Sequence, residues 1–77
     1  MPTAYVLMQT DTGSEVNVLK ALRNVEGVDE AYLVYRLHDI IGKVKADTMD
    51  ELKEIITCRI RRLDKVTSTL VMIVGQR

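Results

Sequence analysis

The last strand-forming segment of this chain, residues 65–74, is apolar on both faces, and so is the first, residues 3–9. In the last segment, Val66 and Leu70 fall on one predicted face and Val71 falls on the other. A strand with one face in solvent alternates apolar and polar residues, whereas a strand covered on both faces does not. The chain has only two helical segments, which are enough to cover one face of a sheet. We therefore expect a second copy of the chain to cover the other face.

The length and the net charge of the chain limit the classes of function that it can have. The chain has 77 residues, so we expect a single domain spanning 1–77. A domain this small buries a modest fraction of its surface, and oligomerisation is a common way to stabilise it. Eleven basic and eleven acidic residues cancel. The chain therefore has no net field to attract nucleic acid or an anionic membrane.

The cysteine content and the apolar runs bear on location. The single Cys58 excludes an internal disulfide and a cysteine-based zinc site, which agrees with a reducing, cytoplasmic setting. No signal peptide is visible. No apolar run approaches the roughly 20 residues that are needed to span a bilayer.

The hydrophobic periodicity predicts the order strand, helix, strand, strand, helix, strand. The strands are expected at 3–9, 28–37, 39–46 and 65–74, and the helices at 14–24 and 49–62. His38 and Asp39 form the polar break of a hairpin between the two middle strands. This order gives two right-handed crossovers and the α+β, ferredoxin-like βαββαβ fold. Both helices would lie on one face of a four-stranded antiparallel sheet, and two such sheets would dimerise as an α/β barrel-like sandwich.

Both helix starts carry a capping-box pattern, in which Thr12 is followed by Glu15 and Thr48 by Glu51. Gly27 suits the left-handed position after the first helix. The buried stripe of the first helix is expected at a three-residue spacing: Val16, Leu19, Leu22 and Val25. The buried stripe of the second helix is expected to contain Leu52, Ile55, Ile56, Ile60 and Leu63.

The hairpin, the second helix start and the last strand together suggest a family. Residues 35–46 contain Asp39 at a hairpin turn and a strand that ends in a Val-x-Ala pair, and residues 47–52 begin a helix with Asp-Thr-x-x-Glu-Leu. Residues 66–71 read Val-Thr-Ser-Thr-Leu-Val. These segments resemble the effector-binding (RAM) domain of the Lrp/AsnC family of transcription regulators. The sequence departs from the family pattern at Arg36, where a turn glycine is expected, and at Val71, where a second threonine often stands.

The resemblance implies a ligand site at the hairpin and the last strand. A carboxylate at Asp39, the hairpin backbone donors and the hydroxyls of Thr67 and Thr69 would suit a small zwitterion. His38 lies beside them. Each residue also has an ordinary structural reading, because Asp and His are common in turns and Thr favours strands. We predict ligand-binding roles for His38, Asp39, Thr67 and Thr69, and no catalytic residue, metal or cofactor.

The resemblance also implies a function. We expect a stand-alone module that binds a small amino acid and modulates transcription or metabolism without binding DNA itself. Its expected partners are a second copy in a homodimer, further copies in a larger ring such as a tetramer of dimers, and full-length Lrp/AsnC regulators. Two alternatives stay open. One is a small dimeric α/β-barrel enzyme, and the other is an ACT-like sensor that would bind its ligand at residues 11–13.

Overall fold

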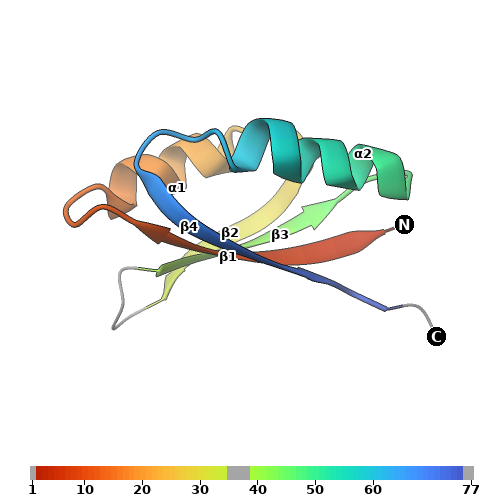
Figure 1. Cartoon of the computed structure of the whole chain (residues 1–77), viewed down its shortest axis with the longest axis horizontal. Coiled ribbons are helices and arrows are strands. Elements are labelled where there is room, and N and C mark those ends of the chain that lie inside the picture. The colour runs from red at the N-terminus through yellow and green to blue at the C-terminus, as the bar shows by residue number, and fades with distance from the viewer. Residues whose placement is uncertain (1, 35–38, 76–77) are drawn as a thin grey trace.

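The computed structural model describes residues 2–34 and 39–75, and it shows a four-stranded antiparallel sheet with all helical segments on one side (Figure 1). The elements are β1 (Thr3–Thr10), α1 (Glu15–Arg23), β2 (Val28–Val34), β3 (Asp39–Lys45), α2 (Met49–Glu54), the π-helix η1 (Ile55–Ile60) and β4 (Val66–Ile73). The strand order is β2-β3-β1-β4, so β1 and β3 are central. The predicted ferredoxin-like α+β fold is therefore confirmed.

The core lies between the sheet and the helical layer. Alternate residues of the two central strands point into it, because successive side chains of a strand face opposite sides of the sheet. The buried apolar residues are Ala4, Val6, Met8, Val18, Leu19, Leu22, Ala31, Ile40, Val44, Ala46, Leu52, Ile56 and Ile60. The predicted contribution of the second helical segment to the core is confirmed.

The start of the first helix differs from the expected capping box. The N-cap of α1 is Ser14, and its side chain makes no capping hydrogen bond. Gly13 has a φ of 89°, and this left-handed turn lets the Ser14 N–H donate to the Asp11 carbonyl oxygen at 3.0 Å. A helix capped by Thr12 would begin at Gly13, whereas α1 begins at Glu15. The predicted stripe is also wrong at Val16, which is 55% exposed, since Val18 is the residue that packs into the core.

The second helical segment is not a single α-helix. The Thr48 hydroxyl accepts a hydrogen bond from the Glu51 N–H at 3.1 Å, so the predicted cap is present. After α2, the segment continues as η1, where the Arg61 N–H donates to the Ile56 carbonyl oxygen at 3.0 Å. A stripe with four-residue spacing drifts around an α-helix of about 3.6 residues per turn. The wider π turn compensates for that drift and keeps Ile56 and Ile60 buried.

The pairing of β1 with β4 contains an irregularity at its end. Gln9 pairs with Ser68, but the next residue, Thr10, pairs with Val66, so Thr67 is the extra residue of a β-bulge. The bulge turns Val66 toward the core, where it packs as a partly buried residue. The prediction that Val66 shares a face with Leu70 is therefore wrong.

Candidate functional site

A polar hollow of about 320 Å³ lies where the end of the π-helix meets the start of β4. Its lining residues are Arg61, Val66, Thr67, Ser68 and Thr69. Arg61 is the C-cap of η1, and the short connection after it brings the chain back into the sheet at Val66. The hollow therefore combines a guanidinium from the helical layer with three hydroxyls from the edge strand.

Two predicted site residues, Thr67 and Thr69, line this hollow. The Thr67 hydroxyl donates to the Gln9 carbonyl oxygen at 3.3 Å, which fixes the side chain across the bulge. Thr69 pairs with Met8, whose side chain is buried under the helices, so Thr69 shares that side of the sheet. Ser68, the other hydroxyl residue of this segment, pairs instead with Gln9 and therefore lies on the side of the sheet away from the helices.

The other two predicted site residues belong to the middle hairpin. Asp39 begins β3, as predicted, and its backbone pairs with both Gln9 of β1 and Val34 of β2. Asp39, Gln9 and Ser68 therefore lie in one row across three neighbouring strands. His38 and Arg36 lie outside the described residues, as does the predicted end of the second strand beyond Val34.

One face of the sheet carries no helix (Figure 1) and is here called the open face. Exposed apolar side chains make its surface apolar. The pairing register brings seven apolar or aromatic side chains together there: Tyr5, Leu7, Tyr32, Val34, Ile41, Leu70 and Met72. Leu70 is 56% exposed and Tyr32 is 54% exposed. Monomeric proteins rarely expose a large contiguous apolar surface, and such a surface usually marks an interaction site.

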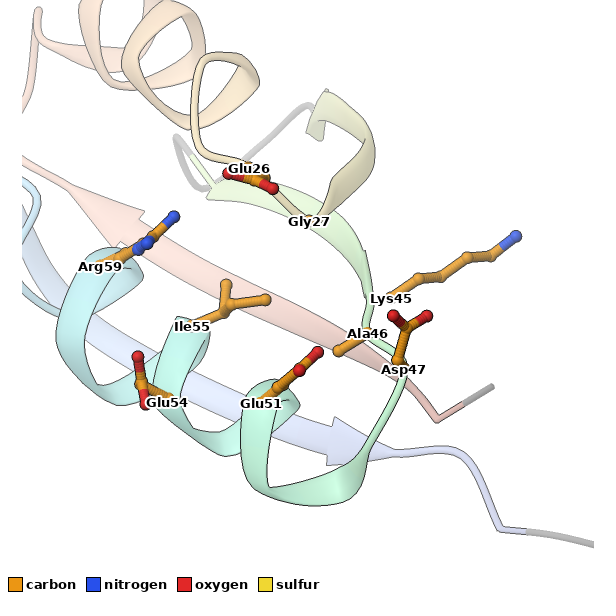
Figure 2. Close-up of a pocket in the computed structure, with 9 residues that line it drawn as sticks. All are labelled: Glu26, Gly27, Lys45, Ala46, Asp47, Glu51, Glu54, Ile55 and Arg59. Atoms are coloured by element: carbon orange, nitrogen blue, oxygen red, sulfur yellow. The ribbon is translucent and has the colours of Figure 1, made fainter.

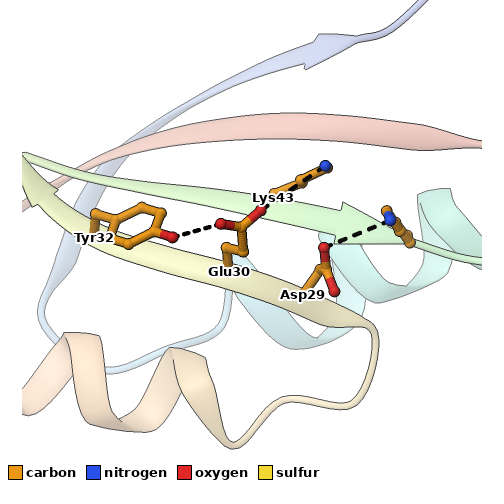
Figure 3. A network of polar contacts seen from close by, with 5 residues as sticks. Asp29, Glu30, Tyr32 and Lys43 are labelled. Carbon is orange, nitrogen blue, oxygen red and sulfur yellow. Dashed lines mark hydrogen bonds and ion pairs between the residues drawn. The ribbon is translucent and has the colours of Figure 1, made fainter.

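Polar contacts border the apolar part of the open face at the β2–β3 side (Figure 3). The Tyr32 hydroxyl donates to Glu30, and the other carboxylate oxygen of Glu30 lies 3.8 Å from the Lys43 ammonium. The Lys45 ammonium lies 3.6 Å from the Asp29 carboxylate. The carboxylate of Glu30 raises the pKa of Tyr32, first through the hydrogen bond and then through its charge. These charges cancel in pairs, so this border adds no net charge to the open face.

A second hollow, of about 490 Å³, lies on the helical side, where the α1–β2 turn, the end of β3 and the second helical segment meet (Figure 2). Its rim carries both signs of charge, including Glu51, Glu54 and Arg59. Its wall contains Gly27 and Ile55, and the space beside Gly27 is too small for a Cβ atom, which would meet the Ile55 side chain. This hollow follows from a tight junction between two elements and contains none of the predicted site residues.

A comparison with known protein families shows which family this chain belongs to. The family described as "Lrp/AsnC ligand binding domain" matches residues 3–77, almost the whole chain. The chain belongs to the Lrp/AsnC family. This family is one of regulatory ligand-binding domains. A comparison with curated protein sequences finds no match.

Solved structures of this family resemble the chain closely. Hypothetical protein PHS023 from Pyrococcus horikoshii is 39% identical with a TM-score of 0.89, and the match covers 100% of this chain and 93% of that protein. FFRP-DM1 is 40% identical with a TM-score of 0.90, covering 97% and 100%. A more distant structure is the transcriptional regulator NMB0573 from Neisseria meningitidis, solved as a complex with L-Met. Its identity is 9% and its TM-score 0.79, covering 97% of this chain and 50% of that one.

Arg61 lines the hollow beside β4, and sequence reasoning did not place it among the candidate site residues. Positive charge at Arg59, Arg61 and Arg62 has an ordinary structural explanation, because it stabilises a helix C-terminus. The usable signal was the short connection from Arg61 to a strand in which three hydroxyl residues follow Val66. Such a connection keeps the guanidinium beside that strand.

Among the described residues, no three side chains of the types His, Cys, Asp or Glu gather into a group that could hold a metal ion. None of the helices in the described ranges is long and apolar enough to cross a membrane.

Proposed function

We propose that this chain is a stand-alone sensor module that binds a small amino acid between its own subunits and acts in the cytoplasm as a regulatory partner. The observation that carries this proposal is the match of nearly the whole chain to a ligand-binding domain family. Two similar solved proteins, PHS023 and FFRP-DM1, are of nearly the same length as the chain. The structure of NMB0573 with L-Met supports an amino acid as the class of ligand.

The position of the predicted site residues favours a site shared between subunits. Asp39 and Ser68 both pair with Gln9, so they are two strand spacings apart, or about 9–10 Å at roughly 4.8 Å per strand. The ammonium and carboxylate of an α-amino acid are attached to the same carbon atom. A ligand between these two residues of one subunit would have to lie over Gln9, which separates them. We infer that the hairpin of one subunit and the β4 hollow of another complete the site.

Assembly begins with the open face in this proposal. A C2 dimer brings the same patch of each subunit together, and the open face suits this arrangement because it is apolar and its bordering charges cancel. Burial of apolar surface contributes about 25 cal/mol per Å² and offsets the loss of rotational and translational freedom. Further contacts between dimers would form a larger ring and bring the hairpin of one dimer to β4 of another.

Regulation without direct DNA contact follows from the charge balance. The net charge of zero gives no electrostatic term for phosphate binding. The module would therefore act through protein partners, and full-length Lrp/AsnC regulators are the natural ones because they share this domain. The enzyme alternative has no observation in its favour. The family match speaks against the ACT-like alternative.

The experiment is a thermal-shift screen of the twenty amino acids, followed by calorimetry on the best one. A ligand that binds only the folded state raises the melting temperature with concentration. Asp39→Ala should weaken that binding by about 1.5–3 kcal/mol, the range for a lost charged hydrogen bond. Asp47→Ala, which changes an exposed carboxylate in a different part of the chain, is the control. If no amino acid binds, the ligand part of the proposal is wrong.

A further inference from the structure

The β4 hollow offers hydrogen-bond donors in excess of acceptors. A guanidinium has five N–H donors and no acceptor. Arg61 makes no ion pair within residues 2–34 and 39–75. No acidic side chain lines the hollow. A negatively charged group is therefore the natural complement of Arg61.

The bulge decides which hydroxyls are available. Thr67 donates its proton to the Gln9 carbonyl oxygen, so it cannot also donate to a ligand. Within the described part of the chain, the hydroxyls of Ser68 and Thr69 have no hydrogen-bond partner. Both line the hollow together with Arg61. Ser68 and Thr69 are consecutive in β4, so their side chains lie on opposite faces of the sheet, and Thr69 lies on the helical side together with Arg61.

We propose that this hollow is a carboxylate-binding subsite, in which Arg61 binds the carboxylate of the ligand with the help of Thr69. The inference rests on the proposed amino-acid site and specifies how the ligand is oriented in it. The hollow binds the carboxylate of the ligand, and the hairpin binds its ammonium group. A guanidinium binds a carboxylate through two parallel N–H···O bonds, which an ammonium cannot reproduce. Arg61 is therefore the residue that discriminates an acid from its amide.

The main test compares the best amino acid of the thermal-shift screen with its α-carboxamide, using calorimetry. Wild type should bind the acid at least about tenfold tighter than the amide, the effect of one charged hydrogen bond. Arg61→Gln should lose this preference while its affinity for the amide changes by less than about twofold. Arg61→Lys should retain part of it. Arg62→Gln is the matched control, because Arg62 is exposed and does not line the hollow, and it should behave as wild type.

A second arm separates this inference from the proposed function. Succinate has carboxylates but no ammonium, so it tests the subsite even if no amino acid binds. At matched ionic strength, succinate should raise the melting temperature of wild type and Arg62→Gln but not of Arg61→Gln. Stabilisation by inorganic phosphate but not by succinate would overturn the carboxylate assignment. The role of Arg61 would be overturned if wild type and Arg61→Gln had the same ratio of affinities for the acid and the amide. It would also be overturned if succinate raised the melting temperature of both proteins equally. The absence of any response to succinate and to amino acids would overturn it as well.

Discussion

The contact between Gly27 and Ile55 should make Gly27→Ala unusually destabilising. Gly27 has a φ of 99°, a conformation that costs a residue with a Cβ atom about 1–2 kcal/mol. A Cβ atom at this position would also lie 2.6 Å from Cδ1 of Ile55 and 3.3 Å from the Lys45 carbonyl oxygen. Overpacking of this kind costs about 1–3 kcal/mol. We expect Gly27→Ala to lower the free energy of unfolding by about 2–4 kcal/mol.

Two further variants separate the causes. Gly13 has a similar φ of 89°, but a Cβ atom there would have no neighbour within 4 Å. Gly13→Ala therefore measures the backbone cost without the clash. Ile55→Val removes Cδ1, the atom that the new Cβ would meet. It should cost about 0.5–1.5 kcal/mol alone, but in the Gly27→Ala background it should restore stability.

The assay is urea denaturation followed by circular dichroism, at one fixed protein concentration because association contributes to stability. The decisive quantity is the coupling energy between Gly27→Ala and Ile55→Val, which should be favourable by about 1–2 kcal/mol. Coupling within about 0.5 kcal/mol of zero would show that the two sites act independently. Equal destabilisation by Gly27→Ala and Gly13→Ala would likewise refute the steric argument.

Two other predictions concern the open face. Leu70→Asp should dissociate the proposed dimer, as measured by light scattering. Val16→Asp is the control and should not, because Val16 is similarly exposed at 55% but lies on α1. An intact Leu70→Asp dimer would contradict the proposed interface. In NMR titration of labelled tyrosine, the pKa of Tyr32 should lie above its usual value of about 10, and Glu30→Gln should bring it down. Because this pKa is raised in the folded state, the associated stability is present below about pH 10 and is lost as pH rises through the folded-state pKa.

Elements with simple periodicity could be predicted from the sequence, and those with interrupted periodicity could not. In β3, Ile40 and Val44 are an even number of residues apart, so a regular strand places them on one face, and both are buried. The Thr48 cap was also predictable, because the hydroxyl and the helix start are three residues from Glu51. Val66 was misplaced because one extra residue in a strand reverses every side chain before it, and no local pattern announced the bulge.

The candidate site was predictable only in part for the same reason. The bulge leaves Thr67 as the extra residue of β4, and only the pairing of β1 with β4 reveals it. Arg61 was missed because its proximity to Thr69 arises from the connection between two elements rather than from spacing within one. Sequence periodicity describes faces within an element, whereas a site usually combines residues from different elements.

The open face and the β4 hollow meet at the row of Asp39, Gln9 and Ser68, so the proposed function connects assembly with ligand binding physically. If the hairpin and the hollow of different subunits contact one ligand, each bound molecule adds contacts across the subunit junction. Linkage then requires that the ligand strengthen assembly by the same factor by which assembly strengthens ligand binding. Dilution of the assembly should therefore weaken ligand binding. A domain with a small core and an uncovered sheet face can respond to an amino acid in this way without a large change in its own fold.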